Sequence, residues 1–342
     1  MNRMPLFISL LGACAAAQAQ VTLSGTMDVA ASRATGSLED RNQVISGANS
    51  TSKLYIRGRE ELGGDMYAMF WLEAGMLADS GAGQQSNLNN QPSGATDDAG
   101  LKFNRRSIVG LGGKTWGVIY LGREWSPTYD TFTGRFDPFG VGSGIGLNYT
   151  ASINPQLVRT SNALAYTTPT FLGGVSAKIQ HWRGENGTDD ATADDGTGEG
   201  LRLNYDRGGL SLLTSFARTK FATGDVIYRN VAGYYDFQSF KLSFNVNHDR
   251  RGELRQTGYL LGGWYRVRTG EVKASYSALR SNGADGKKLA IGYVHDLSKR
   301  TALYATAAHI RNSDGASFAI SGSTTAANRS SSAVDLGVRH NF

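Results

Sequence analysis

The sequence predicts an all-β fold, a sixteen-stranded antiparallel transmembrane β-barrel whose long third loop folds into the pore. Three observations predict it. After residue 19, apolar and polar residues alternate in run after run, and no long apolar segment follows. Short and long connections alternate between those runs. The chain of 342 residues is 40% hydrophobic and holds 44 glycines, which is typical of strands that are apolar only on the side facing lipid.

Residues 1–19 are predicted to be a cleavable signal peptide that is not part of the fold. A positive charge is followed by the apolar run Leu6–Ala17 and by a small-x-small cleavage site at Ala17–Ala19. The run is too short for a transmembrane helix, which needs about twenty apolar residues. Leu11–Cys14 resembles a lipoprotein box with its cysteine lipidated, an alternative that leaves a shorter apolar run. We therefore expect an exported protein whose barrel spans residues 20–342.

Cysteine and charge exclude several classes of function. Cys14 is the only cysteine, and cleavage after residue 19 would leave none, which excludes thiol catalysis, cysteine metal sites and disulfides. Without Arg3 the chain carries 34 basic and 29 acidic residues, a net charge of +5 that forms no block. That spread disfavours a nucleic-acid patch, so we expect no nucleic-acid partner. An inward-facing basic surface that attracts anions fits better.

The period-two alternation is clearest in four runs of the sequence: Leu23–Val29, Leu242–Val246, Val272–Ala278 and Val334–Val338. Alternate residues of a strand face opposite sides, so each run has one apolar and one polar side. A soluble β-sandwich shows the same pattern, with its apolar side buried. The connections must therefore distinguish the two folds.

Seven short turns and eight longer connections separate the expected strands, which makes sixteen strands. Short turns at one end and long loops at the other are typical of outer-membrane barrels, and a soluble sandwich has no reason to separate them. The short turns are 61–65, 112–114, 168–171, 206–209, 236–239, 268–270 and 296–299, and the longer segments are 34–49, 80–100, 122–155, 184–199, 220–226, 250–255, 281–286 and 312–329.

Aromatic residues supply two further signals. The last alternating run leads to Phe342, and a terminal aromatic on such a strand is what the outer-membrane assembly machinery reads. Tyrosines and tryptophans near the expected strand ends could together supply the aromatic girdles at the membrane interfaces, and any single one of them could instead be an ordinary packing residue. They include Tyr67, Trp71, Trp116, Tyr120, Trp182 and Trp264.

The segment 122–155 is too long for an ordinary connection. It is rich in glycine and aromatic residues and carries charges of both signs. A loop of this length in a compact domain usually has a function of its own. We expect it to fold back into the barrel lumen and to narrow it.

In the order and spacing of its motifs, the whole chain after residue 19 resembles the trimeric general porins of Gram-negative bacteria, in particular their β-proteobacterial, anion-preferring branch. The resemblance implies a homotrimer in contact with outer-membrane lipid and lipopolysaccharide, with the third loop folded into each pore. The matching stretches are Val21–Gly25, Ile56–Gly64, Arg105–Leu111, Trp116–Arg123, Phe136–Gly140, Arg159–Tyr166 and Phe342.

The resemblance also implies a row of basic residues on the pore wall, at Lys53, Arg105 and Arg159. Arg57 lies one step along the strand face of Lys53, and alternation gives the two residues the same side. By the same alternation, Arg105 faces the same side of its strand as Ser107. We therefore expect Arg105 in the lumen, and its neighbour Arg106 at the rim or against lipid headgroups.

The basic wall residues would face a loop patch in the region Asp130–Phe139. Cation-preferring relatives carry a pair of acids around Pro138, whereas Arg135 and Phe139 stand in the corresponding places here, with Asp137 between them. This difference favours anions. Asp130 and Asp137 could equally hydrogen-bond the loop backbone or face the solute, and Arg123 and Glu124 could fix the root of the loop.

These features predict a passive diffusion channel for small anionic or polar solutes and ions, with no cofactor, metal or catalytic site. One alternative is a channel for a particular anionic or organic solute, which an aromatic track along the lumen would favour. Another is an outer-membrane hydrolase or adhesin, and a hydrolase would need an inward Ser–His pair. The five histidines lie in no nucleophile motif and at no metal-ligand spacing: His181, His248, His295, His309 and His340.

Overall fold

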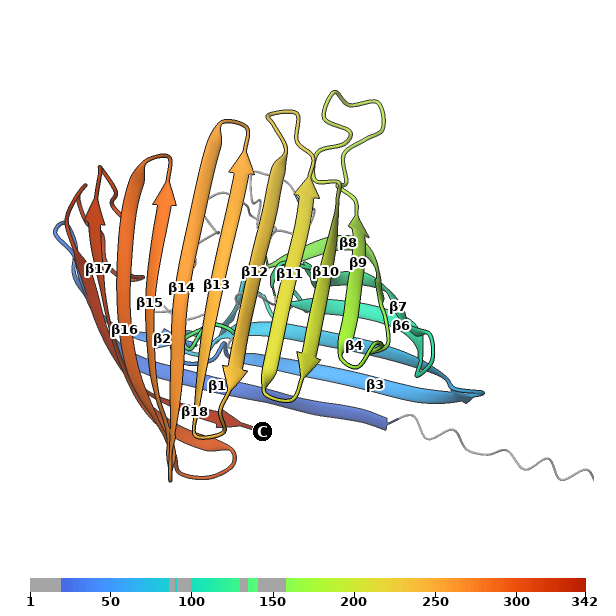
Figure 1. The fold of residues 1–342 in the computed structure, drawn as a ribbon, viewed down its shortest axis with the longest axis horizontal. Helices are drawn as coiled ribbons and strands as arrows, with labels where there is room; N and C mark the ends of the chain where they lie inside the picture. The colour runs from blue at the N-terminus through green and yellow to red at the C-terminus, as the bar shows by residue number, and fades with distance from the viewer. Residues whose placement is uncertain (1–19, 86–89, 91–99, 130–134, 141–157) are drawn as a thin grey trace, which may run out of the picture.

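In the computed structural model the chain forms a closed antiparallel β-barrel (Figure 1). The structure describes residues 20–85, 90, 100–129, 135–140 and 158–342, so the expected signal peptide lies outside the described residues. None of these residues belongs to a helix that is long and apolar enough to cross a membrane.

Each strand pairs antiparallel with its neighbours, and residues 26–35 of the first strand pair with the last strand, which closes the barrel. Closure leaves no free sheet edge, so the backbone hydrogen bonds are satisfied between strands. The strands are β1 Gln20–Thr35, β2 Arg41–Ser46, β3 Lys53–Gly63, β4 Met66–Leu77, β5 Ala82–Gly83, β6 Arg106–Gly113, β7 Gly117–Trp125, β8 Arg159–Thr167, β9 Val175–Trp182, β10 Gly198–Arg207, β11 Leu210–Thr219, β12 Val226–Asp236, β13 Phe240–Arg251, β14 Leu254–Val267, β15 Gly270–Ser281, β16 Ala284–Asp296, β17 Thr301–Ser313 and β18 Ser331–Asn341.

The described strands make sixteen crossings of the wall, as predicted. Both β2 and β3 pair with β1, so they are one crossing interrupted at 47–52. The carboxylate of Asp28 holds this interruption by accepting the backbone N–H groups of Asn49 and Ser50. β5 is a two-residue pairing onto the end of β4.

The two faces of the wall are divided as the alternation predicts. On β13, Ser243, Asn245 and Asn247 are buried inside, whereas Leu242 and Phe244 are exposed outside. Exposed apolar residues cover the outer face of the other long strands as well. This is the inverse of a soluble sandwich, which the fold therefore excludes, and it suits a wall surrounded by lipid.

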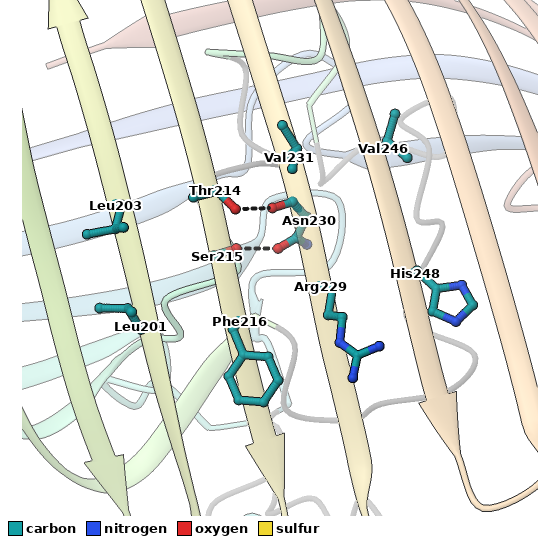
Figure 2. Close-up of a pocket in the computed structure, with 10 residues that line it drawn as sticks. All are labelled: Leu201, Leu203, Thr214, Ser215, Phe216, Arg229, Asn230, Val231, Val246 and His248. Carbon is teal, nitrogen blue, oxygen red and sulfur yellow. Dashed lines mark hydrogen bonds between the residues drawn. The ribbon is translucent and has the colours of Figure 1, made fainter.

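A shallow hollow of about 390 Å³ belongs to this outer face and not to the lumen. Exposed apolar side chains such as Leu203, Phe216 and Val231 line it, and Arg229 and His248 lie toward the end with the longer connections (Figure 2). A basic rim beside apolar walls matches the boundary between acyl chains and headgroups.

The seven short turns lie where they were predicted, but two of the predicted longer connections are only two-residue turns, at 252–253 and 282–283. The ladder between β13 and β14 continues to the pair Arg251 and Leu254, and the ladder between β15 and β16 continues to Ser281 and Ala284. The predicted connections 250–255 and 281–286 were too long because they included polar residues that belong to the strands. The segment 34–49 was also too long, because β2 lies within it.

Several of the aromatic residues considered for the girdles are packing residues of the inner face instead. Tyr120, Trp182 and Trp264 are buried on the inner face, and Trp71 contacts inward arginines. Alternation, rather than nearness to a strand end, decides which side an aromatic residue faces.

The end of the chain helps to close the barrel. The N–H of Phe342 donates to the carbonyl of Gly25 at 3.1 Å, and the N–H of Gly25 donates to the carbonyl of Phe342 at 2.9 Å. These bonds extend the pairing of β18 with β1 by one residue.

Candidate functional site: the basic inner wall

Residues 135–140 of the long connection lie against the inner face of the wall. Phe136 is fully buried against Leu213 and Ala232, and its carbonyl accepts a 2.6 Å hydrogen bond from the hydroxyl of Ser243. Phe139 packs among inward residues of β16, β17 and β18. The segment therefore runs along the wall from β11 to β18 inside the barrel.

Two glycines of the wall make room for this segment. A Cβ on Gly262 of β14 would lie 2.5 Å from Cδ of Pro138, and a Cβ on Gly292 of β16 would lie 3.1 Å from Cε1 of Phe139. A glycine inside a strand often marks such a close approach. These inward glycines were a sequence signal for where the loop lies.

Asp137 is buried between the loop backbone and the wall. Its carboxylate accepts the N–H of Phe139 at 2.9 Å and lies within electrostatic range of Lys288 on β16 and Lys273 on β15. Burial raises the pKa of Asp137 to about 6, against the opposing effect of Lys288. Of the two roles left open by the sequence, these contacts favour anchoring of the loop.

Arg135 is held on another part of the wall from Lys53. Its guanidinium pairs with Asp206 at the end of β10 and donates to the hydroxyl of Ser211 at 2.7 Å. It also lies over the ring of Tyr234, with Cζ 5.7 Å from the centroid. Asp130, the other charged loop residue predicted for the site, lies outside the described residues.

Three of the predicted cations converge on one acid. Arg105 donates through Nε to Oε1 of Glu73 on β4 at 2.6 Å, and both side chains are buried. Lys53 on β3 and Arg159 on β8 lie within electrostatic range of this pair. Glu73 was not among the site residues predicted from the sequence. Glu73 pairs directly with Tyr55 on β3, and this pairing places it on the inward face.

Arg57 faces the lumen but lies some way from this cluster. It is four residues from Lys53 on the same side of β3, which is roughly 13 Å along a strand. Its guanidinium is exposed and lies over Tyr55 and Trp71, with Cζ 5.7 and 5.5 Å from the ring centroids.

Arg106 also faces the lumen, so its predicted place at the rim is wrong. Its Nε donates to Glu124 at 2.9 Å, and its guanidinium lies 4.4 Å from the ring of Trp71. The β4–β6 ladder begins at Arg106, opposite Glu73. Arg105 precedes the strand, where the backbone turns and alternation does not apply, so the two neighbouring side chains both point inward.

The root of the loop is fixed where the sequence indicated. Arg123 donates to the carbonyl of Asn104 at 2.5 Å and to the hydroxyl of Ser161 at 2.6 Å. Glu124 accepts from Arg106 and also from the backbone N–H of Trp125 at 2.6 Å. These bonds tie the start of the loop to β6 and β8.

The inner wall of β3 to β8 has an excess of positive charge. Its cations include Lys53, Arg57, Arg105, Arg106 and Arg159, and the carboxylates that pair with members of this set are those of Glu73 and Glu124. Within the described ranges, no group of three or more His, Cys, Asp or Glu residues is arranged to hold a metal ion.

A Ser–His contact exists, but on the outer face. The Nδ1 of His309 lies 2.8 Å from the hydroxyl of Ser332, and its strand neighbour Ile310 is the one buried inside. This pair does not provide the inward arrangement that the hydrolase alternative required.

A closed sixteen-stranded barrel with an apolar outside and a charged, hydrophilic inside defines a channel of the outer membrane. The chain belongs to the Gram-negative porin family, which it matches over residues 7–315. It is 31% identical over 368 aligned residues to outer membrane porin protein 32 of Delftia acidovorans, with all of both chains covered.

Solved structures agree on the fold. The anion-selective porin from Comamonas acidovorans superposes with a TM-score of 0.81 at 29% identity, over 95% of this chain and all of that one. OmpT of Vibrio cholerae in its trimer form superposes with a TM-score of 0.64 at 14% identity, over 95% of this chain and 99% of that one.

Proposed function

We propose that this porin is a passive diffusion channel for small hydrophilic solutes and ions that prefers anions. The observation that carries the proposal is the convergence of Lys53, Arg105 and Arg159 on the single acid Glu73. Positive charges beside a narrow passage with low-dielectric walls bias ion traffic more strongly than charges on wide, screened surfaces. The similarity to a porin described as anion-selective supports the same preference.

The constriction in this proposal is formed by the basic wall and the loop 122–155. Lys53, Arg105 and Arg159 line its wall, and Arg57 extends the basic surface toward the short turns. Arg135 and Asp137 hold the described part of the loop against the opposite strands. Asp130 is the last residue that we propose for the constriction.

Glu73 has a specific part in this arrangement. A cluster of unpaired cations would bind a passing anion too tightly, whereas conduction requires a site that an ion can also leave. One carboxylate among three cations leaves a moderate positive excess. It also holds Arg105 in one orientation through a charge-assisted hydrogen bond.

The proposed assembly is a homotrimer that contacts outer-membrane lipid and lipopolysaccharide through its apolar outer face. The trimeric form of Vibrio cholerae OmpT supports the oligomer. The hollow with Arg229 and His248 at its rim is suited to an acyl chain beside an anionic headgroup.

Planar-bilayer recording in a potassium chloride gradient tests the function. We expect conductance to rise in steps of three. We expect the zero-current potential to have the sign of the chloride equilibrium potential. A potential on the potassium side would contradict the anion preference, and a purified, folded trimer without conductance would contradict the channel function.

A further inference from the structure

A recess of about 510 Å³ opens on the inner wall near the short turns. Its lining includes Thr22, Arg57, Arg59, Met69 and Trp71. These residues share the inward face, because Arg57 pairs with Thr22 on one side and with Trp71 on the other. The volume lies within the range of about 300–1,000 Å³ that is typical of small-molecule sites.

Arg57 is the charged group that this recess offers to a ligand. Arg59, Arg105 and Arg106 each form an ion pair with a carboxylate. Arg57 forms no ion pair or hydrogen bond within the described part of the chain. Its exposed guanidinium lies beside the rings of Tyr55 and Trp71, and because it is exposed it is accessible to an anion.

Aromatic and cationic groups continue from the recess toward the basic cluster. Arg106 lies between Trp71 and Trp125, with its Cζ 4.4 and 5.4 Å from their rings. The centroids of Trp125 and Tyr129 are 5.1 Å apart, and Cζ of Arg159 lies 6.0 Å from the ring of Tyr129. We call the series Arg57, Trp71, Arg106, Trp125, Tyr129 and Arg159 the cation–aromatic track.

We propose that the recess binds aromatic monocarboxylates, which then pass along the cation–aromatic track. The proposal rests on the channel function proposed above and names a solute class for it. The carboxylate would pair with the fork of Arg57, whose geometry matches two carboxylate oxygens. The ring would stack against Trp71 and contact the thioether of Met69, interactions that a chloride ion or an aliphatic acid cannot make equally well.

Block of chloride current by benzoate tests the proposal, with cyclohexanecarboxylate as a probe of the same charge and similar size. In planar bilayers we expect benzoate, added on the side of the short turns, to reduce chloride current at lower concentration than cyclohexanecarboxylate. Trp71→Leu should raise the half-blocking benzoate concentration about fivefold. Arg57→Gln should raise it about tenfold for both acids.

Two variants control for folding and for general effects. Trp71→Phe keeps an aromatic face and should retain most of the benzoate block, provided that the trimer forms on a detergent gel. Tyr259→Leu removes an aromatic residue from the outer face and should leave the block unchanged.

The outcomes separate this proposal from the channel function. Equal block by both acids, unchanged in Trp71→Leu, would overturn the aromatic site while an anion-directed potential kept the channel proposal intact. If the wild-type protein showed no anion-directed conductance, both the channel proposal and the proposed aromatic site would be contradicted.

Discussion

Nε of Arg105 donates to Oε1 of Glu73 across 2.6 Å, and both side chains are buried on the inner wall. The two residues come from different parts of the chain, since Glu73 lies on strand β4 and Arg105 lies just before strand β6. Their pairing means that the positive excess of the cluster resides mainly in Lys53 and Arg159.

Replacing Arg105 and Arg159 together with glutamine should shift the zero-current potential toward cations. In water-like surroundings a unit positive charge about 5 Å away attracts an anion by roughly 0.8 kcal/mol and repels a cation by the same amount. Each removed charge should therefore lower the anion-to-cation permeability ratio about fifteenfold. The shift should shrink as salt rises, because the Debye length falls from about 10 Å at 0.1 M to about 3 Å at 1 M. Replacing the loop residues Arg183 and Arg329 should do little. If the wall variants and the loop variants shifted the potential equally, selectivity would depend on the electrostatic field of the whole protein and not on the basic wall.

Glu73→Gln should shift the zero-current potential in the opposite direction, further toward anions. It removes the carboxylate of the cluster and leaves Arg105 without its partner. Loss of one partner of a buried ion pair also destabilises, so the trimer should dissociate at a lower temperature. Glu61→Gln is the matched control, because Glu61 pairs with Arg59 on the exposed rim. A shift toward cations in Glu73→Gln would contradict the assignment of the cluster to the ion path.

Lowering the pH from 7.5 to 5 should increase the anion preference through Asp137. The pKa of Asp137 is raised to about 6, so most of its negative charge is lost in this interval, which leaves the cations Lys288 and Lys273 beside it unopposed at pH 5. Asp137→Asn should abolish the step. Because the folded pKa lies above the usual 3.8, this group favours folding fully below about pH 4 and loses that contribution as the pH rises through 6. If the anion preference of Asp137→Asn still increased by the same amount between pH 7.5 and 5, another titrating group would be responsible for the change.

Deleting Phe342 should impair assembly into the outer membrane. The deletion removes two backbone hydrogen bonds to Gly25 at the junction where β18 meets β1. The measurement is the yield of heat-modifiable protein in the outer-membrane fraction, with Phe342→Tyr as the control that retains an aromatic terminus. Full yield of the truncated protein would show that this residue carries no assembly signal.

The protein should migrate as a trimer on a detergent gel without boiling and as a monomer after heating. The exposed apolar outer face is the surface through which the proposed subunits would meet each other and the lipid. Migration as a monomer under both conditions would contradict the proposed homotrimer.

The sequence by itself determined the wall. Period-two alternation is a local property of an extended chain, so runs such as Leu242–Val246 established which side chains face lipid. The positions of the short turns followed from glycine and polar residues that are adjacent in sequence. The turn at Asn282–Gly283 was readable in principle, because an Asn-Gly pair favours a two-residue hairpin. Both residues have the positive φ that this turn requires.

Only the tertiary structure decided which charges meet. The inward direction of Arg106 depends on where the β4–β6 ladder begins, and hydrogen bonds between separate strands set that point. The pairing of Arg135 with Asp206 joins residues 71 apart in the sequence. Alternation assigns a residue to a face but gives no distance between residues on that face. The charge pairs and the cation–aromatic track therefore follow from the register between neighbouring strands and from the contacts of the loop with the wall.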